Sequence, residues 1–570
     1  YTVAQLSNIN TGTTGTITLN SPDVNLSGTV AQFTAAFAGE VTTHTGTVTI
    51  TDVEGTDITA TDITTIDTAS TGTITVSNAI DINGSGSEVA AAFAAIDTNT
   101  GNATANITGT DYTVAQLKAI NAATEGAIVL ADATVALSGT VADIKAAFAG
   151  TVTEHTGTVT ISDAGEVNIT ATDITSINTT NTGTITVSNA IDINGSGSEV
   201  AAAFAAIDTN TGNATANITG TDYTVAQLKA INAATEGAIV LADATVALSG
   251  TVADIKAAFA GTVTEHTGTV TISDAGEVNI TATDITSINT TNTGTITVSN
   301  AIDINGSGSE VAAAFAAIDN NTGNATANVT GTDYTVAQLK AINDATEGAI
   351  VLANAGVALS GDSTDIAAAF AGTVTTHTGT VTITNNDYTV AELKAINNAT
   401  NGDITLNSAG VAISGTVANI KAAFAGTITE HTGTVTISDA GEVNITATDI
   451  TSINTTNTGT ITVSNAIDIN GSGSEVAAAF AAIDTNTGNA TANITGTDYT
   501  VAQLKAINAA TEGAIVLADA TVALSGTVAD IKAAFAGTVT EHTGTVTISD
   551  AGEVNITATD ITSINTTNTG

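Results

Sequence analysis

The chain has 570 residues, with 55 acidic residues against nine lysines and no arginine, and a formal net charge of −46. This charge excludes nucleic-acid binding through a basic face and argues against docking on anionic lipid. The apolar content of 42% and its regular spacing argue against disorder, and no apolar run of about 20 residues predicts membrane insertion. Without cysteine there are no disulfides and no thiolate metal sites.

Nearly the same sequence returns along the whole chain. The motif Tyr-Thr-Val-Ala begins at positions 1, 112, 223, 334, 388 and 499, so the spacing is 111 residues with one exception of 54. Such self-similarity is typical of stacked repeat architectures. We expect a window of a longer array, because the chain opens at Tyr1 without a signal peptide and stops at Gly570 inside a repeat unit. The predicted repeats are 1–111, 112–222, 223–333, the half-length 334–387, 388–498 and the incomplete 499–570.

Each full repeat contains four predicted helix starts. Each start is a Ser or Thr followed three residues later by Asp, Glu or Gln, the capping-box pattern in which the two side chains satisfy free N–H groups of the first turn. In 112–222 the starts are Thr113, Thr140, Thr170 and Ser196. Apolar residues then follow at helical spacing, as in Val114, Leu117 and Ile120. We predict four helices of about ten residues, each too short to be stable alone.

A Gly and a change to period-two alternation follow each helix and predict a strand. The first strands are expected at 126–130, 157–161 and 183–187, with a weaker one at 212–218. A second short alternation follows three of them, at Val135/Leu137, Val167/Ile169 and Ile191/Ile193. One helix with the strands that follow it is called a rung below, and the helix starts recur every 26–30 residues.

Repeating one right-handed crossover stacks every helix on the same side of a parallel sheet. The sequence therefore predicts an α/β solenoid of about 20 rungs, each stable only against its neighbours. It resembles leucine-rich repeats in layout, without their consensus sequence. Strands pack about 4.8 Å apart and helices about 8–10 Å, so we expect a curved or superhelical stack. A pure β-solenoid is the alternative.

The stretch from Asp192 to Glu199 has the alternating oxygen ligands of a calcium loop. Asp192, Asn194, Ser196 and Glu199 are its candidate ligands. The stretch is shorter than the 12-residue EF-hand loop, and Glu199 is already explained as a capping acid. We favour the cap and keep calcium as the alternative, either here or bridging acidic side chains of stacked rungs.

Glu154–His155 recurs in four copies and suggests general-base or metal chemistry. No second histidine or nucleophile lies nearby in the sequence, and Thr43–His44 lacks the acid. We interpret the histidine as a turn or stacking residue. Many Ser and Thr residues are present, but no nucleophile elbow, and we predict no enzyme activity.

Alternating threonines, as in Thr158/Thr160 and Thr184/Thr186, would line one strand face. Regular Thr arrays on solenoids suit an ice or glycan surface, whereas high strand propensity explains the same residues without a ligand. The array is interrupted at Ala127/Val129 in the matching place.

A resemblance to a known class of proteins rests on two kinds of segment, Tyr-Thr-Val-Ala-Gln-Leu-Lys-Ala-Ile-Asn (112–121) and Gly-Thr-Val-Thr-Ile (157–161). In composition and repeat style it resembles the giant repetitive secreted surface proteins of aquatic bacteria, including marine cyanobacteria. That resemblance implies surface layers, adhesive fibres or motility-associated coats outside the cell. We therefore expect a structural protein that associates with itself, or alternatively the stalk or array of an adhesin.

Overall fold

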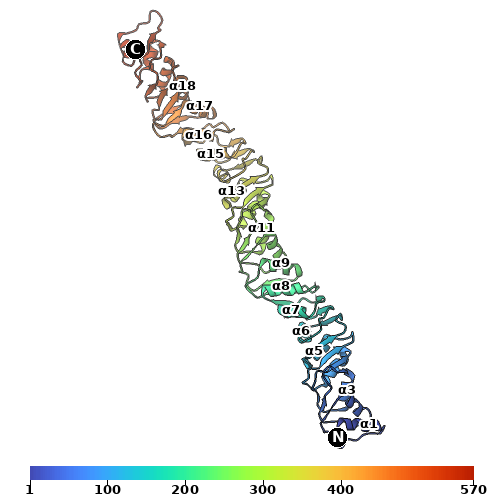
Figure 1. Cartoon of the computed structure of the whole chain (residues 1–570). Coiled ribbons are helices and arrows are strands. Elements are labelled where there is room, and N and C mark those ends of the chain that lie inside the picture. Colours follow the sequence, from blue (N-terminus) through green and yellow to red (C-terminus); the bar gives the residue numbers. More distant parts are fainter. The chain divides into compact units, whose positions relative to one another are not determined.

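The computed structural model describes residues 1–570 (Figure 1). Helices alternate with short strands from one end of the chain to the other. The helices are α1 (Val3–Gly12), α2 (Val30–Phe37), α3 (Ala60–Ala69), α4 (Gly86–Ala95), α5 (Val114–Ala123), α6 (Val141–Ala147), α7 (Ala171–Thr180), α8 (Gly197–Ala206), α9 (Val225–Ala234), α10 (Val252–Ala258), α11 (Ala282–Thr291), α12 (Gly308–Ala317), α13 (Val336–Ala345), α14 (Ser363–Ala369), α15 (Val390–Ala399), α16 (Val417–Ala423), α17 (Ala447–Thr456), α18 (Gly473–Ala482), α19 (Val501–Ala510), α20 (Val528–Ala534) and α21 (Ala558–Asn565).

Two strands follow most helices, and each strand has two to four residues. In the first half of the chain they are β1 (Leu26–Gly28), β2 (Val48–Ile50), β3 (Asp57–Thr59), β4 (Ile74–Val76), β5 (Asp81–Gly84), β6 (Thr98–Asn99), β7 (Thr104–Ile107), β8 (Ile128–Leu130), β9 (Leu137–Gly139), β10 (Val159–Ile161), β11 (Asn168–Thr170), β12 (Ile185–Val187), β13 (Asp192–Gly195), β14 (Thr209–Asn210), β15 (Thr215–Ile218), β16 (Ile239–Leu241), β17 (Leu248–Gly250) and β18 (Val270–Ile272). The remainder are β19 (Asn279–Thr281), β20 (Ile296–Val298), β21 (Asp303–Gly306), β22 (Asn320–Asn321), β23 (Thr326–Val329), β24 (Ile350–Leu352), β25 (Leu359–Gly361), β26 (Val381–Ile383), β27 (Ile404–Leu406), β28 (Ile413–Gly415), β29 (Val435–Ile437), β30 (Asn444–Thr446), β31 (Ile461–Val463), β32 (Asp468–Gly471), β33 (Thr485–Asn486), β34 (Thr491–Ile494), β35 (Ile515–Leu517), β36 (Leu524–Gly526) and β37 (Val546–Ile548).

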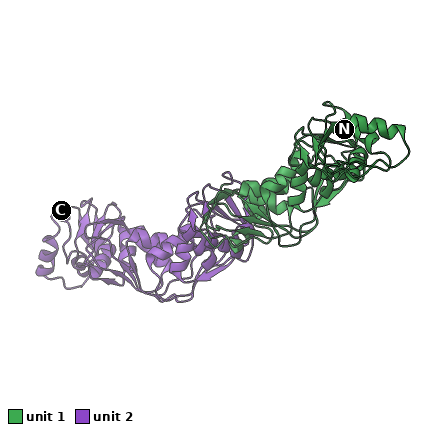
Figure 2. Cartoon of the chain, turned by 90° about the horizontal axis from the view of Figure 1, so that it is seen from below, with its two compact units in different colours: residues 1–273, 287–296 green, residues 274–286, 297–570 purple.

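The predicted α/β solenoid is confirmed, and the pure β alternative is wrong because a helix is present in every rung. Contacts divide the chain into two compact units, residues 1–273 with 287–296 and residues 274–286 with 297–570 (Figure 2). Inside each unit consecutive helices pack on one another, as α5 does on α6 and α15 on α16. The curvature inferred from strand and helix spacings stays a prediction.

Strand pairing is parallel, but it does not form the single sheet that the sequence suggested. Strands β9, β10, β12 and β14 form one four-stranded sheet, and β11, β13, β15 and β16 form another. Apolar residues meet across the pairs, as Val159 does opposite Ile185, and so fill the interior. Strand β15 is a second strand of its rung, yet it pairs with β16, the first strand of the next rung. The sheet built from second strands therefore ends on the first strand of a rung once in every 111-residue repeat.

The predicted capping boxes form in part. Thr113 with Gln116, and Ser196 with Glu199, make both reciprocal bonds. Thr140 accepts the N–H of Asp143 at 3.1 Å without the return bond. At Thr170 the cap prediction is wrong, since no side-chain cap bond forms there. In the equivalent rung of the first repeat the Thr59 hydroxyl instead donates to the Asp62 carboxylate.

The second helix of each full repeat is shorter than the ten residues expected. Helix α6 ends at Ala147, after seven residues. The Asn121 amide of α5 donates to the Ala146 carbonyl at 2.7 Å, so a side chain of the preceding rung satisfies a carbonyl of the last turn. A helix can end where such a partner replaces its own next N–H group.

The half-length repeat joins its neighbours by omitting one strand. After β26 the chain enters α15 without a second strand, and β26 pairs directly with β27 in a three-stranded sheet. Asn385, in this shortened connection, accepts the N–H of Ser363 at 2.9 Å. The stack therefore tolerates a two-rung insertion because the rung after it still finds a strand to pair with.

Candidate functional site

The candidate calcium residues form a helix cap and a strand ladder. The Glu199 carboxylate accepts from the Ser196 N–H at 2.8 Å and from its hydroxyl at 2.9 Å. Asn194 donates to the Asn168 side chain of the preceding rung at 2.9 Å, and Asp192 lies opposite Asn168 in the strand register. No group of three or more His, Asp or Glu side chains gathers around a common point. Calcium bridging between rungs stays a prediction.

Acid is expected to weaken these caps. Bonds from the Ser196 backbone and then its hydroxyl lower the pKa of Glu199, and the same holds at Glu88, Glu310 and Glu475. A carboxylate whose folded pKa is lowered stabilises the fold above its unfolded pKa, about 4.3, and this stability is lost as pH falls through the folded value. We expect a lower melting temperature at pH 3 than at pH 6, in 1 M NaCl to screen charge repulsion.

A matched variant comes from the chain itself, because Gln116 makes the same reciprocal cap on α5. Replacing Glu88, Glu199, Glu310 and Glu475 by glutamine should keep the fold and reduce the loss between pH 6 and pH 3. An identical acid-induced loss in the variant and the parent would contradict the assignment.

The recurring histidine is a buried connection between rungs, as the sequence interpretation held. His155 is 0% exposed. Its Nε2 lies 2.8 Å from the Val135 carbonyl of the preceding rung and its Nδ1 2.6 Å from the Asn181 side chain of the following rung. Glu154, which suggested a catalytic pair, accepts instead from the Thr182 hydroxyl at 2.8 Å. One side chain thus ties three successive rungs together.

Two further connections were not recognised in the sequence. The Tyr112 hydroxyl donates to the Asp132 carbonyl at 2.6 Å, and burial, with the charge of Asp132, raises the pKa of Tyr112 to about 12. The buried carboxylate of Asp163 accepts the first helical N–H of α6, at Val141, at 2.7 Å, and its carbonyl accepts from Asn189. The available signal was an Asp placed two residues beyond the strand in each copy, with Asn385 in the half-length repeat.

Lysines link the exposed faces of neighbouring helices. Lys118 pairs with Asp143 at 2.6 Å, and Lys145 pairs with Asp173. The hydrogen bond from Lys118 and then that from Thr140 lower the pKa of Asp143. The lysines are half exposed and water screens both pairs, so each contributes little to stability. These ion pairs connect neighbouring helices without adding much to the free energy of unfolding.

Threonines on neighbouring strands lie in register. Thr160 of β10 is opposite Thr186 of β12, and Thr186 is opposite Thr209 of β14. Ser138 of β9 continues the row on the other side. The row ends with its four-stranded sheet, so the hydroxyl array recurs in blocks.

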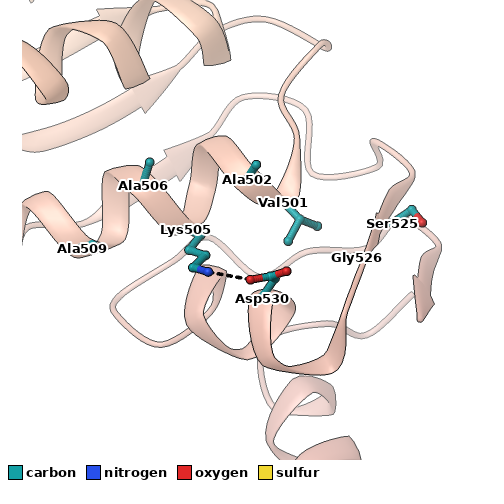
Figure 3. Close-up of a pocket in the computed structure, with 8 residues that line it drawn as sticks. All are labelled: Val501, Ala502, Lys505, Ala506, Ala509, Ser525, Gly526 and Asp530. Atoms are coloured by element: carbon teal, nitrogen blue, oxygen red, sulfur yellow. Dashed lines mark hydrogen bonds and ion pairs between the residues drawn. The ribbon is translucent and has the colours of Figure 1, made fainter. Parts of the chain in front are cut away.

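A groove lies between the first two helices of three repeats. Figure 3 shows the one near α19 and α20. Near α19 and α20 its volume is 550 Å³, and the equivalent grooves near α5 and α9 measure 370 Å³ and 480 Å³. The alanines Ala502, Ala506 and Ala509 line it, beside the Lys505–Asp530 pair at 2.6 Å (Figure 3). Because α20 is three residues shorter than α19, part of this alanine face stays uncovered.

None of the helices combines the length and hydrophobicity needed to cross a membrane. The sequence matches no protein-family model and no curated protein.

Proposed function

We propose that the protein is a structural, extracellular repeat protein that builds a fibre, filament or surface layer by associating with itself. The observation that carries this proposal is the use made of its reactive side chains. His155 bonds to both neighbouring rungs, the Asp163 carbonyl accepts from the following rung, and Tyr112 joins the start of its rung to the turn between its strands. Their counterparts make the same bonds in other repeats. Side chains that serve catalysis in other proteins here bond within the stack of rungs, and each added rung lengthens the molecule.

A periodic surface supports self-association. Val129, Val240, Val351 and Val516 stand at the centres of their strands and are 42–43% exposed, whereas both neighbours of each are buried. Two identical arrays laid in register would repeat any contact made by one of these valines at each of the others. Repeated weak contacts on one scaffold add up to strong association. The charge of −46 opposes such pairing, so salt should promote it.

Replacing these four valines by threonine should weaken self-association about tenfold or more, because each contact loses apolar area. Threonine is compatible with the fold, since Thr18 and Thr405 occupy the same place in the first repeat and after the half-length repeat. Sedimentation velocity over a concentration series in 0.5 M NaCl measures the effect, and electron microscopy shows the assemblies. A parent chain that stays monomeric throughout the series would contradict the proposal.

The second candidate is an adhesin stalk or array that meets ice or a glycan through its threonines. The register of Thr160 with Thr186 favours it, because it spaces hydroxyl groups regularly across a sheet. Thermal hysteresis of the purified chain, compared with a Thr160→Val, Thr186→Val variant, tests the ice surface, and a glycan-array screen tests the other. No hysteresis and no glycan binding would remove this candidate.

A further inference from the structure

All six histidines are wholly buried, and in each the Nε2 atom faces a backbone carbonyl. The carbonyls belong to Val24, Val135, Val246, Val357, Val411 and Val522, at 2.7–2.8 Å. A carbonyl oxygen only accepts hydrogen bonds. Each Nε2 must therefore carry a hydrogen, and the charge of each ring depends on what its Nδ1 meets.

In four copies Nδ1 meets the oxygen of an asparagine amide. The distances from His155, His266, His431 and His542 to the Oδ1 of Asn181, Asn292, Asn457 and Asn568 are 2.5–2.6 Å. The amide orientation is fixed from its other side, where Asn181 Nδ2 donates to the Gly183 carbonyl at 2.7 Å. Turning the amide over would place two acceptor oxygens in contact. Nδ1 is therefore a donor as well, and a ring with two N–H donors is an imidazolium.

In the other two copies Nδ1 meets a hydroxyl. Ser70 Oγ lies 3.1 Å from His44, and Thr400 Oγ1 lies 3.2 Å from His377. A hydroxyl can donate or accept, so these contacts do not require a hydrogen on Nδ1 and are compatible with a neutral imidazole. The Thr400 hydroxyl also lies 3.1 Å from the His377 carbonyl, a second acceptor for its hydrogen. Burial lowers the pKa of His377, against the opposing effect of the Val357 carbonyl.

The surroundings of the asparagine copies suit a cation. A phenylalanine ring accompanies all six histidines, as Phe148 accompanies His155 with centroids 5.8 Å apart, so this contact suits a cation without separating the two sets. Two acidic residues are close in the sequence: Glu154 precedes the histidine, and Asp132 follows the first strand of the preceding rung. In the next repeat the pKa of Asp243 is lowered chiefly by Thr245 and further by the charge of His266.

We propose that His155, His266, His431 and His542 are buried imidazolium ions that clamp three successive rungs, whereas His44 and His377 are neutral.

Nitrogen NMR of the full chain, labelled with ¹⁵N in histidine and recorded at pH 8, tests this directly. We expect four of the six imidazoles to have two protonated nitrogens and two to have one bare nitrogen. Ser70→Asn should add a fifth imidazolium, and the fold accepts it because Asn181 occupies the equivalent position one repeat later. Asn181→Ser should leave three. Six neutral rings in the parent, or a four-to-two ratio that neither substitution moves, would overturn the proposal.

Discussion

Replacing Gly402 by alanine is expected to open the strand pairing around it and to raise amide hydrogen exchange there about a hundredfold. A Cβ atom at this position would lie 1.9 Å from the Gly379 carbonyl oxygen of the preceding rung and 2.6 Å from its carbon. Both are backbone atoms, so the rungs must move apart. Overpacking of this kind costs about 3 kcal/mol, and each 1.4 kcal/mol is tenfold in an equilibrium.

Gly410→Ala is the matched control. It lies in the same rung, and the nearest atom to its Cβ would be the Thr432 hydroxyl oxygen at 3.7 Å. Residues 384–430 differ in sequence from the other repeats, so mass spectrometry can follow exchange separately in peptides that include them. Protection of β26 and β27 should fall in Gly402→Ala and persist in Gly410→Ala. Equal protection in the two variants would show that the rungs are not stacked this closely.

Replacing Asp439 by alanine is expected to destabilise helix α16 by about 2 kcal/mol. Its buried carboxylate accepts the Val417 N–H at 2.7 Å, and its carbonyl accepts from Asn465 at 2.6 Å. Alanine leaves the Val417 N–H without that partner at the start of a seven-residue helix. Asp439 lies two residues beyond β29, so its side chain caps the helix that opens its own rung.

Asp439→Asn separates the lost hydrogen bond from the lost charge. Asn385 performs the same task for Ser363 in the half-length repeat, at 2.9 Å, so asparagine should cost less than 1 kcal/mol. Hydrogen exchange in peptides covering 411–424 reports the stability of α16. If alanine and asparagine destabilise α16 equally, the carboxylate does not act as its cap.

The sequence predicted the rung well, because the rung is a local pattern. The cap residues, the apolar spacing of Val114, Leu117 and Ile120, and the period-two strands all lie within about 25 residues and gave the α/β solenoid. The interpretation of His155 as a turn or stacking residue followed from the lack of any partner for chemistry nearby in the sequence; its burial was not predicted. These features need no knowledge of which rung touches which.

The bonds that depend on strand register were not predictable in the same way. Asp163 reads as a loop acid, and only the register of β9 on β10 brings it to the N–H of Val141. The change of strand row at β15 and β16 likewise depends on pairing across repeats, where no local period distinguishes one partner from the other. The missing cap at Thr170 is not a local feature either, because Thr557 forms a full capping box in the same sequence.

Deleting one whole repeat tests most directly the claim that the chain is a stack of equivalent rungs whose number can change without loss of the fold. Removing residues 112–222 joins Asp111 to Tyr223. The same Asp-Tyr sequence occurs at the native junctions 111–112 and 222–223, so every remaining rung keeps a native neighbour. Removing 112–236 also takes away α9 and leaves too few residues for the crossover between the parallel strands β7 and β16. We predict that the first deletion keeps the circular dichroism per residue and the melting temperature of the parent, and that the second loses both. Unfolding after the first deletion, or equal stability of the two, would contradict the account.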